Sequence, residues 1–299
     1  MKKIFALLAV AITVIALVAG CGSNSSKGGD KAKTIGFSVS TLNNPFFVSM
    51  KDGVEKEAKA LGLNVKIVDA QNDPAKQAND INDLIESGVS VLIINPVDSA
   101  AVSTQVEAAN AKNIPVITVD RSADSGKVVA HIASDNVKGG EMAANLIVEK
   151  VGANAKVAEL EGNPGASATR ERGQGFHNVA DTKLNVVAKQ SADFDRTKGL
   201  NTASNMLQAN PDVQAIFAQN DEMALGAIQA AKSAGKNIFI VGFDGTEDAQ
   251  TAVQNGTLAA TIAQQPDLMG KIAIDTAKDV MDGKTVDAKI PVDLKLITK

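Results

Sequence analysis

Hydrophobic positions follow two alternating periods along most of the chain. From Thr34 onward, short apolar runs are separated by longer stretches in which apolar residues recur every three or four positions. The short runs are typical of buried strands, and the longer stretches are typical of amphipathic helices. The pattern predicts strands near residues 34–39, 65–68, 89–94, 115–119, 128–132, 156–160, 184–189, 213–218, 238–243 and 258–263. It predicts helices near residues 47–61, 74–85, 98–109, 136–151, 167–181, 195–209, 222–234, 246–253 and 267–282.

This alternation indicates parallel βαβ units. After the helix near 136–151 the same order of elements begins again, so the two halves share an architecture. A chain of 299 residues with 44% apolar residues can build two lobes, each with its own core. The place of the last helix and of the tail near residues 290–296 cannot be read from this periodicity.

The stretch at residues 40–50 contains the first candidate site. Asn44 can cap a helix, and Pro45 suits the first helical position, so a helix begins directly after the first strand. Open α/β sheets bind ligands at the carboxyl ends of their strands. Phe46 and Phe47 would offer an apolar face beside the Asn44 amide, which suits a sugar ring. For an isolated pair of phenylalanines, burial in the core is the simpler interpretation.

Net charge and aromatic content restrict the classes of ligand that the chain is expected to bind. The net charge of −4 gives no excess of basic residues, so nucleic-acid binding is not expected. The chain has neither Trp nor Tyr, and Phe is therefore the only large aromatic side chain available for stacking.

The N-terminus has the features of an export signal. Lys2 and Lys3 precede an apolar run over residues 4–18, which ends in small residues before Cys21. Residues 17–21, LVAGC, resemble the lipobox of bacterial lipoproteins. This resemblance implies cleavage after residue 20, lipidation of Cys21 and a flexible tether over residues 21–33. Because Cys21 is the only cysteine, no disulfide is expected.

Polar and aromatic residues gather at further strand ends. Asp accepts hydrogen bonds, Arg donates in a fixed fork, and Asn and Gln do both, which together match several neighbouring hydroxyl groups. Taken one at a time, these residues could equally be helix caps, surface pairs or packing residues. The set comprises Asp120, Arg121, Arg170, Arg172, Phe194, Asn220, Asp244 and Gln264.

A catalytic interpretation finds little support in the sequence. Asp120 and Asp244 could be the two carboxylates of a glycosidase, but the sequence does not fix their separation. His131 and His177 have no recognisable nucleophile and no metal-ligand spacing, and we expect them to be surface or strand-end residues. The glycine-containing loops near 162–165 and 173–175 do not match a nucleotide-binding motif. We expect no catalytic residue, no cofactor and no metal.

Five motifs of three to ten residues resemble the D-ribose-binding proteins of bacterial ABC importers, in a resemblance that covers nearly the whole mature chain. They are STLNNPFF at residues 40–47, VDR at 119–121, ADFDRTKGL at 192–200, FAQNDEMALG at 217–226 and VGFDG at 241–245. The resemblance implies an α/β fold with two Rossmann-like lobes of parallel sheets, joined by a three-crossover hinge, which is the periplasmic binding protein type I fold. The implied N-terminal lobe comprises residues 34–134 and 265–293. The implied C-terminal lobe comprises residues 135–264 and 294–299.

The resemblance also implies the site. Ribose would lie between Phe46 and Phe47 on one side and Phe194 on the other. The implied polar ligands are Asn44, Asp120, Arg121, Arg172, Asn220, Asp244 and Gln264, with Ser40, Arg170 and Phe243 nearby. Closure of the lobes around the sugar would then signal to a membrane permease.

Partners and location follow from the same resemblance. It implies a monomer on the outer face of the cytoplasmic membrane or in the periplasm, held to the membrane only by lipid, with a permease as its partner. Whether a chemotaxis receptor also binds it stays open. Three alternatives remain open: a binding protein for another monosaccharide such as allose, galactose or a furanose, the sugar-sensing core of a repressor, and a glycoside-processing enzyme. The repressor would need a DNA-binding motif where the signal and tether lie.

Overall fold

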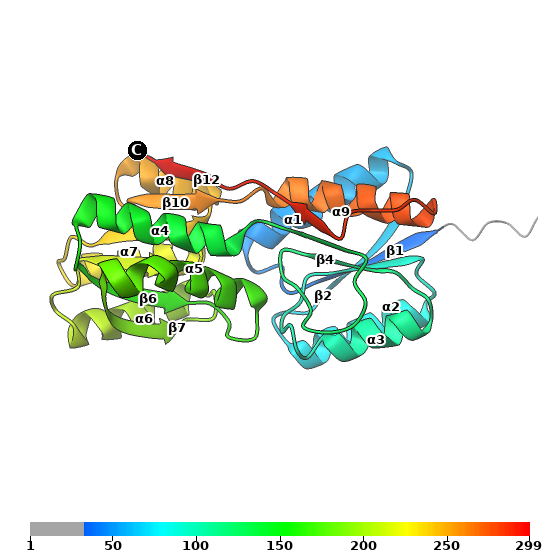
Figure 1. Ribbon diagram of the computed structural model, residues 1–299, viewed down its shortest axis with the longest axis horizontal. Helices are drawn as coiled ribbons and strands as arrows, with labels where there is room; N and C mark the ends of the chain where they lie inside the picture. The colour runs from blue at the N-terminus through cyan, green and yellow to red at the C-terminus, as the bar shows by residue number, and fades with distance from the viewer. Residues whose placement is uncertain (1–32) are drawn as a thin grey trace, which may run out of the picture. The chain divides into compact units, whose positions relative to one another are not determined.

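The computed structural model describes residues 33–299. The predicted signal peptide, Cys21 and the tether before Lys33 lie outside the described residues. Within residues 33–299 the chain forms two six-stranded sheets with helices on both faces (Figure 1). The predicted fold class, two α/β lobes built on parallel sheets, is confirmed.

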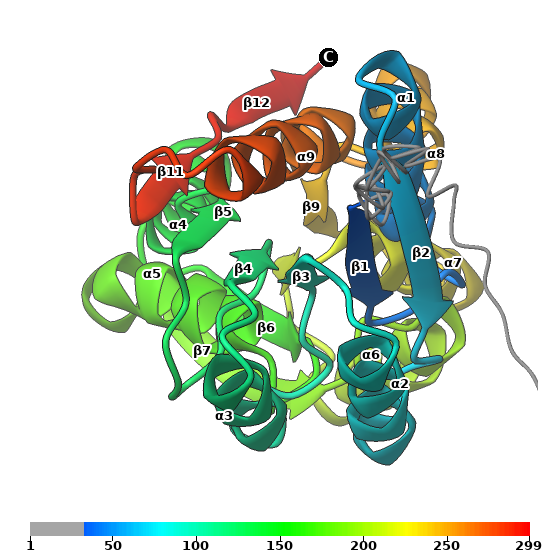
Figure 2. The same ribbon diagram turned by 90° about the vertical axis from the view of Figure 1, so that its right-hand side faces the viewer.

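The N-terminal lobe is built on a fully parallel sheet with the strand order β11-β5-β4-β3-β1-β2. Its strands are β1 (Thr34–Val39), β2 (Asn64–Asp69), β3 (Val91–Ile94), β4 (Val116–Val119), β5 (Ala130–Ala133) and β11 (Lys289–Pro291). Helices α1 (Pro45–Ala60) and α9 (Pro266–Met281) cover one face, and α2 (Pro74–Glu86) and α3 (Ser103–Ala111) cover the other (Figure 2). All four residues of β3 are buried, as a central strand covered on both faces requires.

The C-terminal lobe repeats this topology with the order β12-β10-β9-β8-β6-β7. Its strands are β6 (Lys156–Glu161), β7 (Asn185–Ser191), β8 (Ala215–Ala218), β9 (Phe239–Asp244), β10 (Ala260–Ala263) and β12 (Lys295–Thr298). Its helices are α4 (Asn136–Val151), α5 (Ser167–Lys183), α6 (Arg196–Ala209), α7 (Asp221–Ser233) and α8 (Glu247–Asn255). Strand β12 is antiparallel to β10, whereas the other described strand pairs of this sheet are parallel.

The chain passes between the two lobes three times within the described residues. The passages lie between β5 and α4, between β10 and α9, and between β11 and β12. The three-crossover arrangement therefore agrees with the predicted fold class. The particular residues proposed as lobe boundaries stay predictions.

Helix α3 and several strands begin later than the sequence pattern predicts. The side chain of Asp98 accepts hydrogen bonds from Ala100 N at 2.9 Å and Ala101 N at 2.8 Å, so a turn precedes α3. Val213 and Leu258 are buried, yet they lie before the first ladder residues of β8 and β10. Apolar residues in a sequence indicate which positions are buried. Buried positions continue beyond the residues that pair in the sheet, so the predicted strands begin too early.

Candidate functional site

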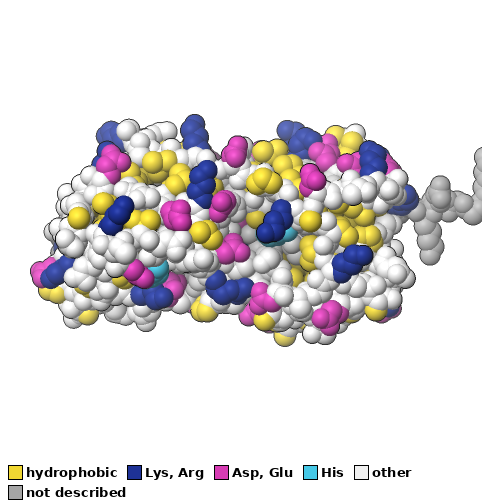
Figure 3. Space-filling model, in the orientation of Figure 1, with side chains coloured by type: hydrophobic (Ala, Val, Ile, Leu, Met, Phe, Trp, Pro, Cys, Tyr) yellow, Lys and Arg dark blue, Asp and Glu magenta, His cyan; other side chains and the backbone are white. Residues whose placement is uncertain are grey.

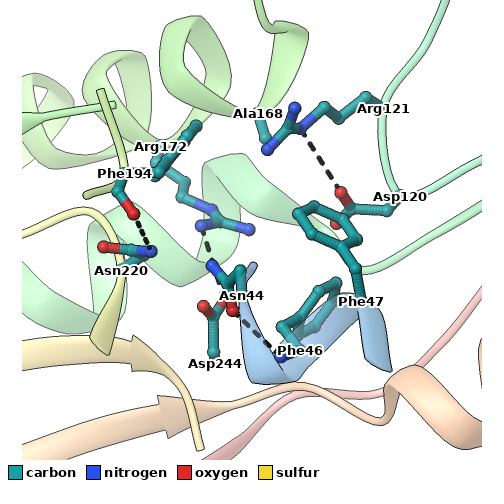
Figure 4. Close-up of a pocket in the computed structure, with 10 residues that line it drawn as sticks. All are labelled: Asn44, Phe46, Phe47, Asp120, Arg121, Ala168, Arg172, Phe194, Asn220 and Asp244. Atoms are coloured by element: carbon teal, nitrogen blue, oxygen red, sulfur yellow. Dashed lines mark hydrogen bonds and ion pairs between the residues drawn. The ribbon is translucent and has the colours of Figure 1, made fainter. Parts of the chain in front are cut away.

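The pocket that carries the candidate chemistry lies at the carboxyl ends of strands from both lobes (Figure 4). Its lining comprises Asn44, Phe46, Phe47, Asp120, Arg121, Ala168, Arg172, Phe194, Asn220 and Asp244.

The start of α1 provides the aromatic part of the N-terminal lobe's contribution. Asn44 is the N-cap, and its Oδ1 accepts a hydrogen bond from Phe46 N at 2.9 Å. The rings of Phe46 and Phe47 meet edge to face, with centroids 5.1 Å apart, and each residue is only 3% exposed. Both phenylalanines belong to the apolar core beneath α1 and also line the pocket. The two interpretations of the phenylalanine pair are therefore compatible.

Asp120 and Arg121 follow the end of β4 and form a buried ion pair. Arg121 Nε lies 3.5 Å from Asp120 Oδ2, which also accepts a hydrogen bond from Asn95 Nδ2 at 3.2 Å. The Arg121 guanidinium carbon lies 5.0 Å from the ring centroid of Phe47 and 5.1 Å from that of Phe194. Burial lowers the pKa of Arg121, opposed by the charge of Asp120. An arginine of the N-terminal lobe thus contacts an aromatic ring from each lobe.

Arg172 is the corresponding buried cation of the C-terminal lobe, one turn into α5. Its Nε donates to Asn136 Oδ1 at 2.9 Å, and its Nη1 donates to the backbone carbonyl of Gln219 at 2.6 Å. The guanidinium carbon lies 3.9 Å from the ring centroid of Phe243. These contacts fix the plane of the guanidinium group, because Arg donates hydrogen bonds only in that plane.

Asp244, the last residue of β9, is held between Arg172 and Gln264. Its Oδ1 lies 3.7 Å from Arg172 Nη1 and accepts a hydrogen bond from Gln264 Nε2 at 2.9 Å. Burial raises the pKa of Asp244 well above its usual value; Arg172 opposes this rise, and the nearby Asp221 adds to it. Gln264 is also buried, and it contacts Asp244 without lining the pocket itself.

Asn220 and Phe194 complete the C-terminal lobe's side of the pocket. Asn220 caps α7 through its Oδ1, which accepts from Met223 N at 2.9 Å, and its Nδ2 donates to the carbonyl of Phe194 at 3.2 Å. A Cβ atom at Gly162 would lie 2.0 Å from the Phe194 ring. The ring of Phe194 therefore occupies space that only glycine leaves free.

Three pocket residues have an unusual backbone conformation. The φ angles are 64° at Asp120, 60° at Phe194 and 124° at Asp244. Residues other than glycine rarely adopt positive φ, which costs about 1–3 kcal/mol per residue, and such strain is concentrated at functional sites. Its occurrence at three residues of one pocket supports a binding role for this region.

Several buried polar atoms here have no hydrogen-bond partner among residues 33–299. Asp120 Oδ1 and Arg121 Nε belong to residues that line the pocket, and Gln264 Oε1 and Ser40 Oγ lie beside it. Leaving such an atom unsatisfied costs about 1–3 kcal/mol. A ligand with several hydroxyl groups would supply both the donors and the acceptors that these atoms lack.

The remaining predicted residues lie around the pocket in different ways. Ser40 is fully buried, and its backbone N donates to Asn95 Oδ1 at 3.2 Å. Phe243 lies against Arg172. Arg170 does not line this pocket; it is exposed and pairs with Asp124 at 2.8 Å.

Sequence reasoning missed three residues of this region. Asn95 hydrogen bonds to Asp120, Asn136 holds Arg172, and Ala168 lines the pocket. The position of Asn95 directly after β3, at the same sheet edge as the other candidates, could have indicated it. Ala168 has no polar side-chain atom, so no chemical pattern could have found it.

The two histidines lie outside the pocket. His131 is on β5, and its Nδ1 lies 2.9 Å from Thr118 Oγ1. His177 lies on α5 between Glu159 and Asp181, at 2.9 and 2.6 Å, and the hydrogen bond with Glu159 is the main reason its pKa is raised to about 9. Within residues 33–299, no group of three or more His, Cys, Asp and Glu side chains could hold a metal ion.

Two parallel-sheet lobes with a polar and aromatic pocket at facing strand ends define a class of ligand-binding proteins. The periplasmic binding protein domain matches residues 35–285, and the chain belongs to this family. It is 62% identical to the ribose import binding protein RbsB of Bacillus subtilis, over 92% of this chain and 90% of that protein. It is 55% identical to the protein of the same name from Escherichia coli, over 100% of this chain and 99% of that protein.

Among solved structures, the chain is similar to the Caulobacter myo-inositol binding protein bound to myo-inositol. That match has a TM-score of 0.86 and 31% identity, over 90% of this chain and 94% of the other. Within residues 33–299, no helix is both long enough and apolar enough to cross a membrane.

Proposed function

We propose that this chain is the extracytoplasmic sugar-binding component of an ABC importer, which captures D-ribose between its two lobes and delivers it to the permease. The observation that carries this proposal is the set of buried polar atoms beside aromatic rings that have no hydrogen-bond partner within residues 33–299, chief among them Asp120 Oδ1. The similarity to ribose import binding proteins over the whole chain supports ribose as the ligand.

The sugar ring lies between Phe46 and Phe47 of one lobe and Phe194 of the other. The N-terminal lobe binds hydroxyl groups through Asn44, Asp120 and Arg121. The C-terminal lobe binds the remaining polar atoms through Arg172, Asn220, Asp244 and Gln264. The charged groups among these are buried, so a missing or inverted hydroxyl group leaves one of them unpaired and lowers affinity by about 1–3 kcal/mol.

Half of this set of groups lies on each lobe, which links binding to closure. Ribose contacts both halves only when the lobes are closed, so it stabilises the closed form by its differential contacts. The permease then distinguishes the loaded protein by the position of its lobes. The protein itself performs no chemical step on the sugar.

The N-terminal segment fixes the location in this proposal. Lipid on Cys21 holds a monomeric protein at the outer face of the cytoplasmic membrane, and residues 21–33 form the tether. A chemotaxis receptor is a further partner for the closed form. Mass spectrometry of the Cys21-containing peptide from membranes tests the anchor: an unmodified thiol would contradict it.

Calorimetric titration tests the ligand. The purified protein is unfolded and refolded to remove endogenous sugar, then titrated with ribose, allose, galactose and glucose. We expect tight one-to-one binding of ribose and much weaker binding of the hexoses. Tight binding of another sugar without ribose binding would contradict the assigned ligand, and release of free sugar from added ribosides would contradict a binding-only role.

A further inference from the structure

The two lobes are joined by direct hydrogen bonds beside the pocket. Ser99 follows β3 in the N-terminal lobe, and its N donates to the Gly165 carbonyl of the C-terminal lobe at 2.9 Å. Ser167 N donates to Ser99 Oγ at 3.1 Å, and Ser122 N donates to Ser167 Oγ at 2.9 Å. We call Ser99, Ser122, Gly165 and Ser167 the interlobe clasp. None of the four lines the pocket.

The clasp completes the start of α5 across the lobe boundary. The N-cap of α5 is Ala166, which has no side chain that can accept a hydrogen bond. Ser99 Oγ, from the opposite lobe, accepts the hydrogen bond of the first helical N–H group, which belongs to Ser167. The first N–H groups of a helix need such external acceptors. This acceptor is therefore present only while the lobes are closed.

Burial indicates that the serines matter more than the neighbouring ion pair. Ser99 is fully buried and Ser167 is 3% exposed, so water does not compete for these hydrogen bonds in the closed form. The interlobe pair of Arg170 and Asp124 lies at the surface, with side chains 47% and 44% exposed. Exposed pairs of this kind contribute little.

Gly165 permits the close approach of the lobes. A Cβ atom at this position would lie 2.1 Å from Asp98 Oδ2. Asp98 cannot easily move aside, because its Oδ1 accepts hydrogen bonds from Ala100 N and Ala101 N. A side chain at residue 165 would consequently hold the lobes apart at the clasp.

We infer that the interlobe clasp stabilises the closed form independently of the sugar, so that Ser99 and Ser167 set sugar affinity without contacting sugar. This inference rests on the proposed function only in using a sugar as the measured ligand. The observed affinity of a closing protein depends on the free energy of closure as well as on ligand contacts. Residues that change closure alone should alter the affinity for every sugar by the same factor.

Calorimetry on the full chain tests this inference with the double variant Ser99→Ala/Ser167→Ala. Loss of the two side-chain hydrogen bonds should raise the Kd about tenfold or more, at about threefold to tenfold per bond. The ratio of the Kd for ribose to that for a weaker sugar should stay unchanged. Gly165→Val should also raise both Kd values by one common factor. Ser204→Ala is the matched control, because its hydroxyl donates only to Leu200 O within α6; its Kd should equal that of the wild type.

A Kd within twofold of the wild type in the double variant, or a changed ratio between sugars, would overturn the inference. Circular dichroism and thermal unfolding check that each variant folds. Small-angle scattering without sugar separates this result from the proposed function: the double variant should have a larger radius of gyration than the wild type. If the wild type binds no ribose, the assigned ligand is wrong, and scattering alone then tests the clasp. An unchanged radius of gyration in the double variant would overturn the inference about the clasp.

Discussion

Asn44 and Asn220 have the same double role on opposite lobes of the pocket. Each is the N-cap of the helix that follows a strand, α1 after β1 and α7 after β8, and each lines the pocket. In both, Oδ1 accepts a backbone hydrogen bond at 2.9 Å, from Phe46 N and from Met223 N. The cap therefore fixes which way the amide points, and the NH₂ group is the part left for other contacts.

Replacing Asn220 should affect both stability and binding. Asn220→Ala removes the cap of α7, which should lower the free energy of unfolding by about 0.5–2 kcal/mol. It also removes an amide from the pocket, and we expect the Kd for ribose to rise at least tenfold. Urea unfolding and calorimetry measure the two effects. The control is Asp73→Ala, which removes the cap of α2 away from the pocket: similar destabilisation with unchanged Kd is expected, and a raised Kd there would show that affinity merely follows stability.

Replacing Arg172 with lysine should lower both the stability of the protein and its affinity for ribose. Arg172 donates through Nε and Nη1 to two different partners, which a single ammonium group cannot reach together. Arg172→Lys should lower the free energy of unfolding by about 2 kcal/mol and raise the Kd more than tenfold. Arg196→Lys is the surface control, since Arg196 pairs with Glu222 and Asp248 while 45% exposed. Equal losses in the two variants would contradict a special role for the buried guanidinium.

The ring of Phe194 should contribute to affinity with little effect on stability. Phe194 is only partly buried, and its ring lies over Arg121 of the opposite lobe. Phe194→Leu should raise the Kd about threefold to tenfold, because an aromatic contact contributes about 0.5–1.5 kcal/mol. Phe176→Leu changes a fully buried ring stacked on Phe217 in the core. That control should lose stability and keep its Kd; the opposite pattern would refute the assignment.

Stability should fall as pH rises from neutral to alkaline values. The hydrogen bond with Glu159 raises the pKa of His177 to about 9 from an ordinary value of 6.5. A raised pKa means that the folded state holds the proton more tightly, so the stabilisation is complete below pH 6.5 and is lost as pH rises through about 9. Because the ring is partly exposed, we expect a loss of only about 1 kcal/mol.

Urea unfolding of the wild type and of His177→Gln at pH 6, 7.5 and 9 measures this loss. Titrating groups that do not contact His177 are common to both proteins, so the difference between their pH profiles reports His177 together with its partners Glu159 and Asp181. The difference should shrink as the pH rises. Parallel profiles would mean that the His177 proton does not contribute to stability.

The order of strands and helices could be predicted because the spacing of apolar residues shows which side of each element is buried. The start of α1 was predicted from Asn44, and this residue caps the helix. The late start of α3 was missed, since the turn made by Asp98 depends on two side-chain hydrogen bonds and not on periodicity. Strands β11 and β12 could not be assigned to a sheet, because their pairing partners lie far away in the sequence.

The site could be predicted only where a residue can be recognised from its neighbours in the sequence. Every pocket residue except Ala168 was anticipated, Arg172 among the polar residues near strand ends and the others within the motifs. The supporting contacts were not, because Asn136 holds Arg172 and Asn95 holds Asp120 across many residues of sequence. Arg170 and Arg172 lie two positions apart on α5 and so face different directions, which explains why one reaches the surface and the other the pocket.

The last part of the chain completes the lobe that the first part begins. Lys289 of β11 pairs with His131 of β5, and α9 packs so closely on α1 that Gly270 faces the backbone of Met50. A growing chain that has not yet released these residues has an unpaired edge at β5 and an uncovered apolar face on α1. Contacts over such distances in sequence form slowly. The sheet and the α1 face of the N-terminal lobe are therefore complete only once the C-terminal residues of the chain have joined them.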